Sequence, residues 1–377
     1  MSQKINSVVV LKGLSVASAG AALILWTTGT KAAAAAFTNA PLFQDVANYT
    51  TTISANNDLA DIYFPNPSNL KTGNYSFPIA LLLQGANVDK SNYSNFASTV
   101  ARYGFVVVVP NHPKSLPQIG FTGLLPETSQ INAVLAQMVA ENSNTASPIA
   151  GVVNTEKLAL LGHSAGGAVG LSAIANLCLP ILCEGSFSRP KELVAGAFFG
   201  ANLRNVTTQE FIPINNSTIP IALLQGNLDT IGLPIRAEKT YEQIKNPPKA
   251  LITILGANHY GITNTNNPSG AAPDRNPPTI AQDVAVETVA RWSGLFLRAS
   301  ILDDKNALNY VYATGDTLDS NVSVISQGKP IPEPSLIWGL VVLSTWGALS
   351  RLKKPKQQTV DKFYQVKSAA PVLTQLK

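Results

Sequence analysis

The chain has 377 residues, 45% of them hydrophobic, and a formal net charge of +5. This length and apolar content suffice for one large domain with a buried core, which excludes a wholly disordered chain. The excess positive charge lies in residues 1–36 and 351–377, and the segment between them has a net charge of −4. That segment has no basic stripe of the kind that binds a phosphate backbone, so we expect no nucleic-acid partner.

The N-terminus has the pattern of a secretory signal peptide. Lys4 and Lys12 accompany an apolar stretch, residues 14–26, and small residues follow with the spacing of a cleavage site near residues 34–36. We assign residues 1–36 to a signal peptide that signal peptidase removes, with an uncleaved anchor as the alternative. The protein is therefore expected to be exported to the periplasm, the cell surface or the medium.

From about residue 46 to residue 299, short β-rich runs alternate with amphipathic helical stretches, and apolar runs such as IALLL and FVVVV indicate strands buried on both faces. This alternation predicts an α/β fold with a mostly parallel central sheet and helices on both faces, within a catalytic domain of residues 37–328. The predicted strands are residues 51–53 with 61–64, 78–83, 105–109, 157–161, 194–199, 219–224 and 250–255, and a further strand-like stretch is 308–325. The predicted helices are residues 93–103, 126–142, 165–177, 233–244 and 280–297.

The C-terminal part of the sequence has a different character. A Pro-rich linker, residues 329–335, leads to an apolar helix, residues 336–350, and then to a basic tail, residues 351–377. An apolar segment that ends in a basic cluster is typical of a membrane segment with its C-terminal flank in the cytoplasm. It is shorter than the roughly 20 residues of a full span, and a buried globular helix is the alternative.

This C-terminal block resembles the PEP-CTERM sorting signal of bacterial surface proteins, because the triplet Pro332-Glu333-Pro334 precedes the apolar helix and its basic flank. The resemblance implies a sorting enzyme as a partner and a membrane association through the helix. The 27 residues after Ser350 form a longer tail than that family normally has.

The chain has two cysteines, Cys178 and Cys183, in the sequence CLPILC. In an oxidising compartment they can form one small local disulfide, and the alternative is a pair of buried free thiols. No Cys/His cluster and no nucleotide-binding loop is present in the sequence, so we expect neither a metal nor an organic cofactor.

A predicted strand, residues 157–161, runs directly into the sequence GHSAGG and then into a predicted helix. A G-x-S-x-G motif in this setting is a nucleophile elbow, in which a sharp turn exposes the serine hydroxyl. Gly162 and Gly166 are expected because the turn leaves no room for a Cβ at either position. Ser164 is therefore the predicted nucleophile.

A serine nucleophile needs a base to accept its proton and a carboxylate to orient that base. Of the three histidines, only His259 follows Ser164, and Asp229 is the only aspartate between them. Both lie just past a predicted strand, and the order Ser, acid, His is the one expected for such an elbow. We predict a Ser164, Asp229, His259 triad, and interpret His163 as a packing residue and His112 as structural or pocket-lining.

An oxyanion hole requires two backbone N–H groups, one of which comes from the residue after the nucleophile, Ala165. The second is expected after the strand of residues 78–83, where Gly85 permits a tight bend; Ala86 is the first choice and Asn87 the second. The pocket is expected to depend on the loops of residues 113–125 and 200–216. Possible pocket residues are Asn87, His112, His163 and Tyr260.

The segments QGAN, PNHP, GHSAGG, QGNLD and GANHYG, in this order, resemble the α/β-hydrolases related to chlorophyllases, dienelactone hydrolases and bacterial cutinase-like polyester hydrolases. The resemblance covers about residues 45–300 and implies an α/β-hydrolase fold, the triad and oxyanion roles just given, and a small-molecule, lipid or polyester ester as substrate. Dienelactone hydrolases use a cysteine nucleophile where this chain has Ser164, which favours ordinary carboxylic esters. The alternatives are acyl transfer to an acceptor other than water and a catalytically silent, surface-anchored binding protein.

Overall fold

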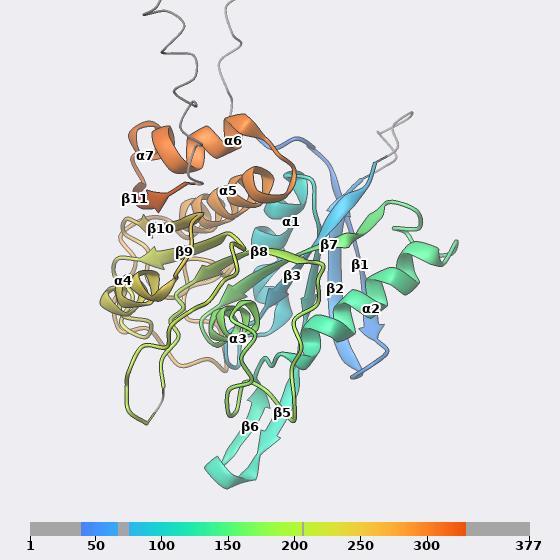
Figure 1. The fold of residues 1–377 in the computed structure, drawn as a ribbon, viewed down its shortest axis with the longest axis horizontal. Coiled ribbons are helices and arrows are strands. Elements are labelled where there is room, and N and C mark those ends of the chain that lie inside the picture. Colours follow the sequence, from blue (N-terminus) through green and yellow to red (C-terminus); the bar gives the residue numbers. More distant parts are fainter. Residues whose placement is uncertain (1–38, 67–74, 206, 329–377) are drawn as a thin grey trace, which may run out of the picture. The chain divides into compact units, whose positions relative to one another are not determined.

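The computed structural model describes residues 39–66, 75–205 and 207–328, and the compact unit discussed below begins at Pro41 (Figure 1). The predicted signal peptide, residues 1–36, and the predicted C-terminal linker, helix and tail, residues 329–377, lie outside the described residues. Within the described ranges, no helix has the length and apolar content needed to cross a membrane.

A nine-stranded sheet forms the centre of this unit, with the strand order β1-β2-β4-β3-β7-β8-β9-β10-β11. The strands from β4 to β10 in this order run parallel, whereas β1, β2 and β11 pair antiparallel at the two edges. The strands are β1 Val46–Ile53, β2 Asp58–Pro65, β3 Phe77–Leu83, β4 Val106–Pro110, β7 Val153–His163, β8 Leu193–Phe199, β9 Ile221–Gly226, β10 Lys249–Ile254 and β11 Val322–Gln327. Every residue of β3 and β4 is buried, as the continuous apolar runs predict.

Helices connect most successive parallel strands, as crossover connections commonly do, whereas an irregular segment joins β8 to β9. The helices are α1 Ser94–Arg102, α2 Ser129–Ser143, α3 Ala165–Ile174, α4 Pro234–Gln243, α5 Gln282–Ile301, α6 Lys305–Asn309 and α7 Gly315–Leu318, with short 3-10 turns at Lys90–Tyr93 and Pro117–Ile119. Pro234 is the first residue of α4, where its missing N–H costs no intrahelical bond.

The sheet has an apolar layer on each face because successive side chains of a strand point in opposite directions. Ile79, Leu81 and Leu83 of β3 belong to one buried cluster together with residues of α2, α3 and α4. Ala80 and Leu82, between them, are also fully buried but lie outside that cluster. On their side of the sheet α1 and α5 pack against each other (Figure 1). The predicted α/β fold with helices on both faces is confirmed.

The predicted strand-like stretch of residues 308–325 is wrong over most of its length. Residues 305–318 form α6, a π-helical turn Tyr310–Thr314 and α7, and only Val322–Gln327 is a strand. Asp304 caps α6 by accepting hydrogen bonds from the N–H groups of Asn306 and Ala307, each at 3.0 Å. The buried side chains Ala307, Tyr310 and Val311 then recur at helical rather than alternating spacing.

The loop expected at residues 113–125 contains a hairpin of two short strands, β5 Pro113–Leu116 and β6 Phe121–Leu124, which projects from the bottom of Figure 1. The helix expected from residue 126 begins at Ser129 instead. The reason is that the residues before it make tertiary contacts: the Glu127 carboxylate binds Lys114, and the N–H of Thr128 donates to the carbonyl of Leu182.

Candidate active site

Ser164 occupies the sharp turn between β7 and α3, with φ +52° and ψ −115°. This left-handed backbone is unfavourable for a residue with a side chain, and such strain is concentrated at functional sites. The two elbow glycines are sterically required. A Cβ on Gly162 would lie 2.7 Å from the backbone of Gly166, and a Cβ on Gly166 would lie 2.0 Å from the carbonyl oxygen of Leu83. Ser164 at this turn is half-buried and lines a cavity.

Asp229 follows β9 and His259 follows β10, so both lie at the same edge of the parallel strands as Ser164. Nδ1 of His259 lies 2.7 Å from Oδ2 of Asp229, and both residues are 2% exposed. Oδ1 of Asp229 accepts hydrogen bonds from the N–H groups of Ile231 at 2.8 Å and Gly232 at 2.6 Å. A carboxylate held in this way fixes the proton of His259 on Nδ1 and leaves Nε2 able to accept one.

A second buried carboxylate, Asp274, joins the two loops that carry this pair. Its Oδ2 accepts hydrogen bonds from the N–H of His259 at 2.9 Å and the N–H of Thr230 at 3.2 Å, and its Oδ1 accepts from the hydroxyl of Thr230. Burial by itself would raise the pKa of Asp274, but the hydrogen bonds from Thr230, His259 and Asn276 outweigh burial and lower it. Asp274 is thus an ionised group that fixes the residue after Asp229 and the backbone of His259.

Asp274 does not follow from the order of serine, acid and histidine in the chain, because it lies after His259. The signal for it is the length of its loop, since residues 255–281 contain no helix or strand. Loops longer than about 12–15 residues are uncommon in compact domains and are often functional.

His163, the residue before the serine, is fully buried and connects three parts of the site. The N–H of Gly85 donates to the hydroxyl of Tyr93 at 2.8 Å, and that hydroxyl lies 2.9 Å from Nδ1 of His163. Nε2 of His163 lies 2.9 Å from the carbonyl oxygen of His259. Because a carbonyl oxygen can only accept, Nε2 carries the proton and donates to it, and Nδ1 accepts from the phenol of Tyr93.

Two causes hold His163 neutral. Burial lowers the pKa of His163 to about 3, and the nearby ring of His259 contributes in the same direction. His163 packs beside the elbow as predicted, and its ring also makes hydrogen bonds. Through these bonds it links the loop after β3 to the loop after β10.

The two predicted oxyanion donors lie in the expected turns. Ala165 is the first residue of α3, where a backbone N–H has no acceptor within the helix. Of the residues after β3, Gly85 donates its N–H to Tyr93, and Asn87 donates its N–H to the carbonyl of Leu124 at 2.8 Å. Ala86, between them, has no acceptor for its N–H among the described residues, which favours it over Asn87 as the second donor.

A cavity of about 500 Å³ opens beside Ser164, within the size range of small-ligand sites. Ser164, Ala165, Gly200 and Gly232 form one side of it, and Gly200 and Gly232 lie directly against Asp229. The other walls are mostly apolar and come mainly from the loops of residues 179–182 and 202–212. They comprise Ala168, residues 179–182, Leu203, Ile212 and Ile231, with the polar residues Asn202, Arg204, Asn205 and Thr207.

The sequence also predicted four pocket residues that do not line this cavity: Asn87, His112, His163 and Tyr260. Nδ1 of His112 lies 2.9 Å from Oδ1 of Asp58, which makes His112 part of a buried polar cluster. Tyr260 is buried and donates its hydroxyl to the carbonyl of Ala272. Of the two loops expected to shape the pocket, residues 200–216 contribute to the wall, whereas residues 113–125 do not contact the cavity.

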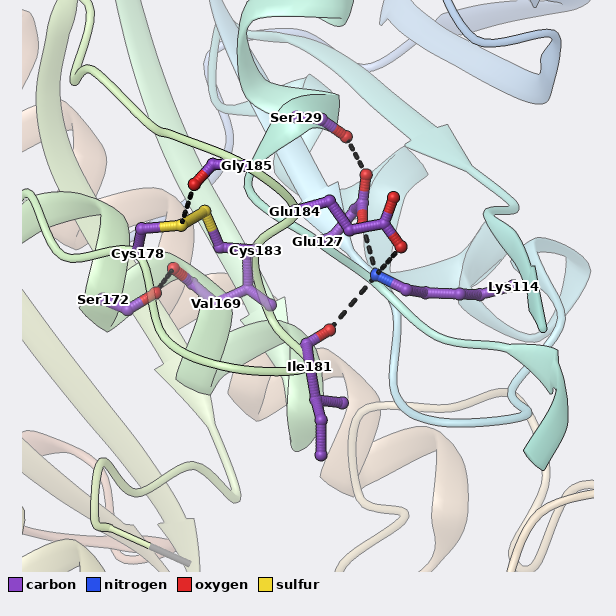
Figure 2. Close-up of a disulfide and its surroundings, with 10 residues drawn as sticks. All are labelled: Lys114, Glu127, Ser129, Val169, Ser172, Cys178, Ile181, Cys183, Glu184 and Gly185. Carbon is purple, nitrogen blue, oxygen red and sulfur yellow. Dashed lines mark hydrogen bonds and ion pairs between the residues drawn. A yellow bond between two sulfur atoms is a disulfide. The ribbon is translucent and has the colours of Figure 1, made fainter. Parts of the chain in front are cut away.

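The two cysteines are joined: Cys178 and Cys183 form a disulfide with a Cα–Cα distance of 5.2 Å (Figure 2). Of the two alternatives left open by the sequence, the local disulfide is present. It closes the loop of residues 179–182, all of which line the cavity. Among the described residues, no group of three or more His, Cys, Asp or Glu side chains could hold a metal ion.

A mostly parallel sheet with a serine in a strained strand-to-helix turn, and an acid–base pair after two later strands, defines the α/β-hydrolase fold. Within this class, residues 42–179 match the chlorophyllase family. The matched segment contains Ser164 and ends before Asp229 and His259.

Two curated chlorophyllases are similar over part of the chain. Chlorophyllase-1, chloroplastic, from Citrus sinensis is 30% identical over 107 residues, which cover 27% of this chain and 31% of that protein. Chlorophyllase-1, chloroplastic, from Citrus unshiu is 30% identical over 94 residues, which cover 24% of this chain and 27% of that protein. The aligned part spans less than a third of these relatives, and over this part the chain is similar to chlorophyllases.

Proposed function

We propose that this protein is a serine hydrolase that cleaves carboxylic esters through an acyl-enzyme intermediate. The observation that carries the proposal is the 2.7 Å contact between Asp229 and His259, at the same sheet edge as the strained elbow of Ser164. Similarity to chlorophyllases, an esterase family, supports the same reaction class.

In the proposed mechanism, the hydroxyl oxygen of Ser164 attacks the ester carbonyl while Nε2 of His259 accepts the hydroxyl proton. Asp229 stabilises the resulting imidazolium, and the N–H groups of Ala86 and Ala165 bind the oxyanion. Collapse of the tetrahedral intermediate breaks the ester C–O bond, and His259 gives its proton to the leaving alcohol. Water then attacks the acyl-enzyme by the same route, which releases the acid and restores Ser164.

The disulfide supports the proposal that the protein works outside the cytoplasm. Disulfides persist in oxidising compartments and are rare in the cytosol. The bond between Cys178 and Cys183 therefore agrees with the export expected from residues 1–36. Retention at the membrane through residues 336–350, and recognition by a sorting enzyme, are part of the same proposal and rest on the sequence pattern.

The test is hydrolysis of p-nitrophenyl esters by the purified chain and by two serine variants. Ser164→Ala should lower kcat by about 10⁴ or more, because only oxyanion stabilisation and binding then remain. Ser172→Ala is the matched control, since Ser172 lies in α3, the helix that follows Ser164, and its hydroxyl donates to the carbonyl of Val169 at 2.8 Å. Equal activity in the two variants would refute the proposal.

Product analysis with a competing alcohol separates hydrolysis from acyl transfer to another acceptor. Hydrolysis predicts the free acid as the main product, whereas a transferase would form the new ester. Absence of turnover together with absence of labelling by a serine-directed probe would instead favour the binding-protein alternative.

A further inference from the structure

The loop closed by the disulfide forms one wall of the cavity beside Ser164. Leu179, Pro180, Ile181 and Leu182 all line the cavity, and they follow the helix whose first residue, Ala165, lines it from the other end. All four residues are apolar, so this wall of the cavity is apolar throughout. A ligand group that contacts it must be apolar, because a polar group would lose its water without gaining a side-chain partner.

The conformation of this loop is strained at its centre. Ile181 has φ +73°, in the left-handed region that a β-branched residue rarely adopts. A backbone of this kind persists only where its surroundings hold it in place. The disulfide between Cys178 and Cys183 supplies one such restraint by tying the two ends of the loop together.

Lys114 supplies a second restraint. Its ammonium group donates to the carbonyl oxygen of Ile181 at 3.2 Å, forms an ion pair with Glu127, and lies 3.3 Å from a carboxylate oxygen of Glu184. Figure 2 shows this group between the Ile181 carbonyl and the two carboxylates, with the Ile181 side chain extending away from it. Lys114 is 8% exposed and does not line the cavity.

The start of α2 adds a third contact. The N–H of Thr128 donates to the carbonyl oxygen of Leu182 at 3.0 Å. The carbonyl groups of Ile181 and Leu182 are therefore both bound by donors outside the cavity, while the two residues line it.

We propose that residues 179–182 are the specificity-determining wall of this site, which binds an extended apolar chain of the ester, and that the disulfide and Lys114 hold the wall in its binding position. The proposal rests on the proposed esterase function. It assigns the disulfide-closed loop to substrate selection and leaves the chemical step to the triad.

The experiment compares kcat/KM for p-nitrophenyl octanoate and p-nitrophenyl acetate, using the full chain. Ile181→Trp fills the cavity from this wall and should lower the octanoate-to-acetate ratio by about tenfold or more, since even one methylene group in an apolar pocket contributes tenfold or more to discrimination. Ile325→Trp is the matched control, because Ile325 is 58% exposed on the edge strand β11. A ratio that changes no more in Ile181→Trp than in Ile325→Trp would overturn the proposal.

Two further variants test the restraints. Lys114→Met leaves the carbonyl of Ile181 without its donor, and Cys178→Ser combined with Cys183→Ser opens the loop. Both should raise KM for the octanoate with little change for the acetate. Lys239→Met is the control for Lys114→Met, because the side chains of Lys239 and its partner Glu242 are 48% and 56% exposed and an exposed ion pair contributes little. If KM for the octanoate is unchanged in both restraint variants, neither Lys114 nor the disulfide holds the wall in its binding position.

Labelling of Ser164 by a fluorophosphonate distinguishes failure of the wall proposal from failure of the esterase proposal. A variant that is labelled at the parent rate but has lost octanoate selectivity has a defect in chain binding alone. If the parent chain is not labelled, the esterase proposal itself fails, whatever the wall does.

Discussion

The carboxylate of Asp274 accepts the backbone N–H of His259 at 2.9 Å, across a separation of 15 residues in the chain. Through Thr230 the same carboxylate also holds the residue next to Asp229. The acid and the base of the proposed triad are thus joined twice: directly through their side chains and indirectly through Asp274.

Asp274→Ala should lower kcat by about tenfold or more with a smaller effect on KM, because a displacement of about 1 Å in a catalytic group can cost far more than that. The substitution leaves the N–H of His259 and both donors of Thr230 without their acceptor. Steady-state kinetics on a p-nitrophenyl ester checks this. Asp316→Ala, at an exposed aspartate in α7, is the control, and equal kcat values in the two variants would contradict the positioning role.

Asp229→Asn should lower kcat by about 10⁴ while the variant stays folded, because an amide in this position favours the wrong tautomer of the base. Oδ1 of Asp229 accepts two backbone N–H groups, so an Asn side chain keeps its oxygen there and turns its NH₂ group toward His259. Nδ1 of His259 then becomes an acceptor and Nε2 carries the proton. Activity above about a tenth of the parent value would exclude Asp229 as the triad acid.

His163 should make the folded state less stable as the pH falls below about 6.5. Burial lowers the pKa of His163 to about 3, so between these values the unfolded chain binds a proton that the folded chain does not. The resulting loss between pH 7 and pH 5 is on the order of 2 kcal/mol in the free energy of unfolding.

Urea unfolding at the two pH values measures this loss. His163→Gln lacks the titrating group and should show a smaller decrease over the same interval, with lower stability at pH 7 because the bonds to Tyr93 and His259 are disturbed. Identical pH dependence in the parent and the variant would show that His163 is not the group responsible.

Much of the fold follows from local sequence. The central strands are continuous apolar runs, and tertiary contacts do not compete with that pattern. The hairpin of β5 and β6 and the late start of α2 do not follow from local patterns in this way. Lys114 in β5 and Thr128 before α2 both bond to the loop of residues 179–182, which is distant in sequence. The predicted strand-like stretch of residues 308–325 overlaps the helical segment of residues 305–318, although the cap at Asp304 is a local signal for the start of α6.

The same distinction between local sequence patterns and tertiary contacts applies to the candidate site. Ser164, Asp229 and His259 could be predicted because a local motif and the order of residues in the chain identify them. Asp274 lies beyond His259 in a loop without regular structure, and the cavity wall consists of apolar loop residues with no motif. Their roles depend on which loops meet in space, and single-sequence patterns do not encode this.

Ser164 is tested most directly as the nucleophile by reaction of the purified chain with a fluorophosphonate probe, followed by mass spectrometry of the labelled peptide. We expect one stoichiometric adduct on Ser164, absent in Ser164→Ala and retained in Ser172→Ala. An adduct on another residue, or no adduct on a folded chain, would contradict this assignment.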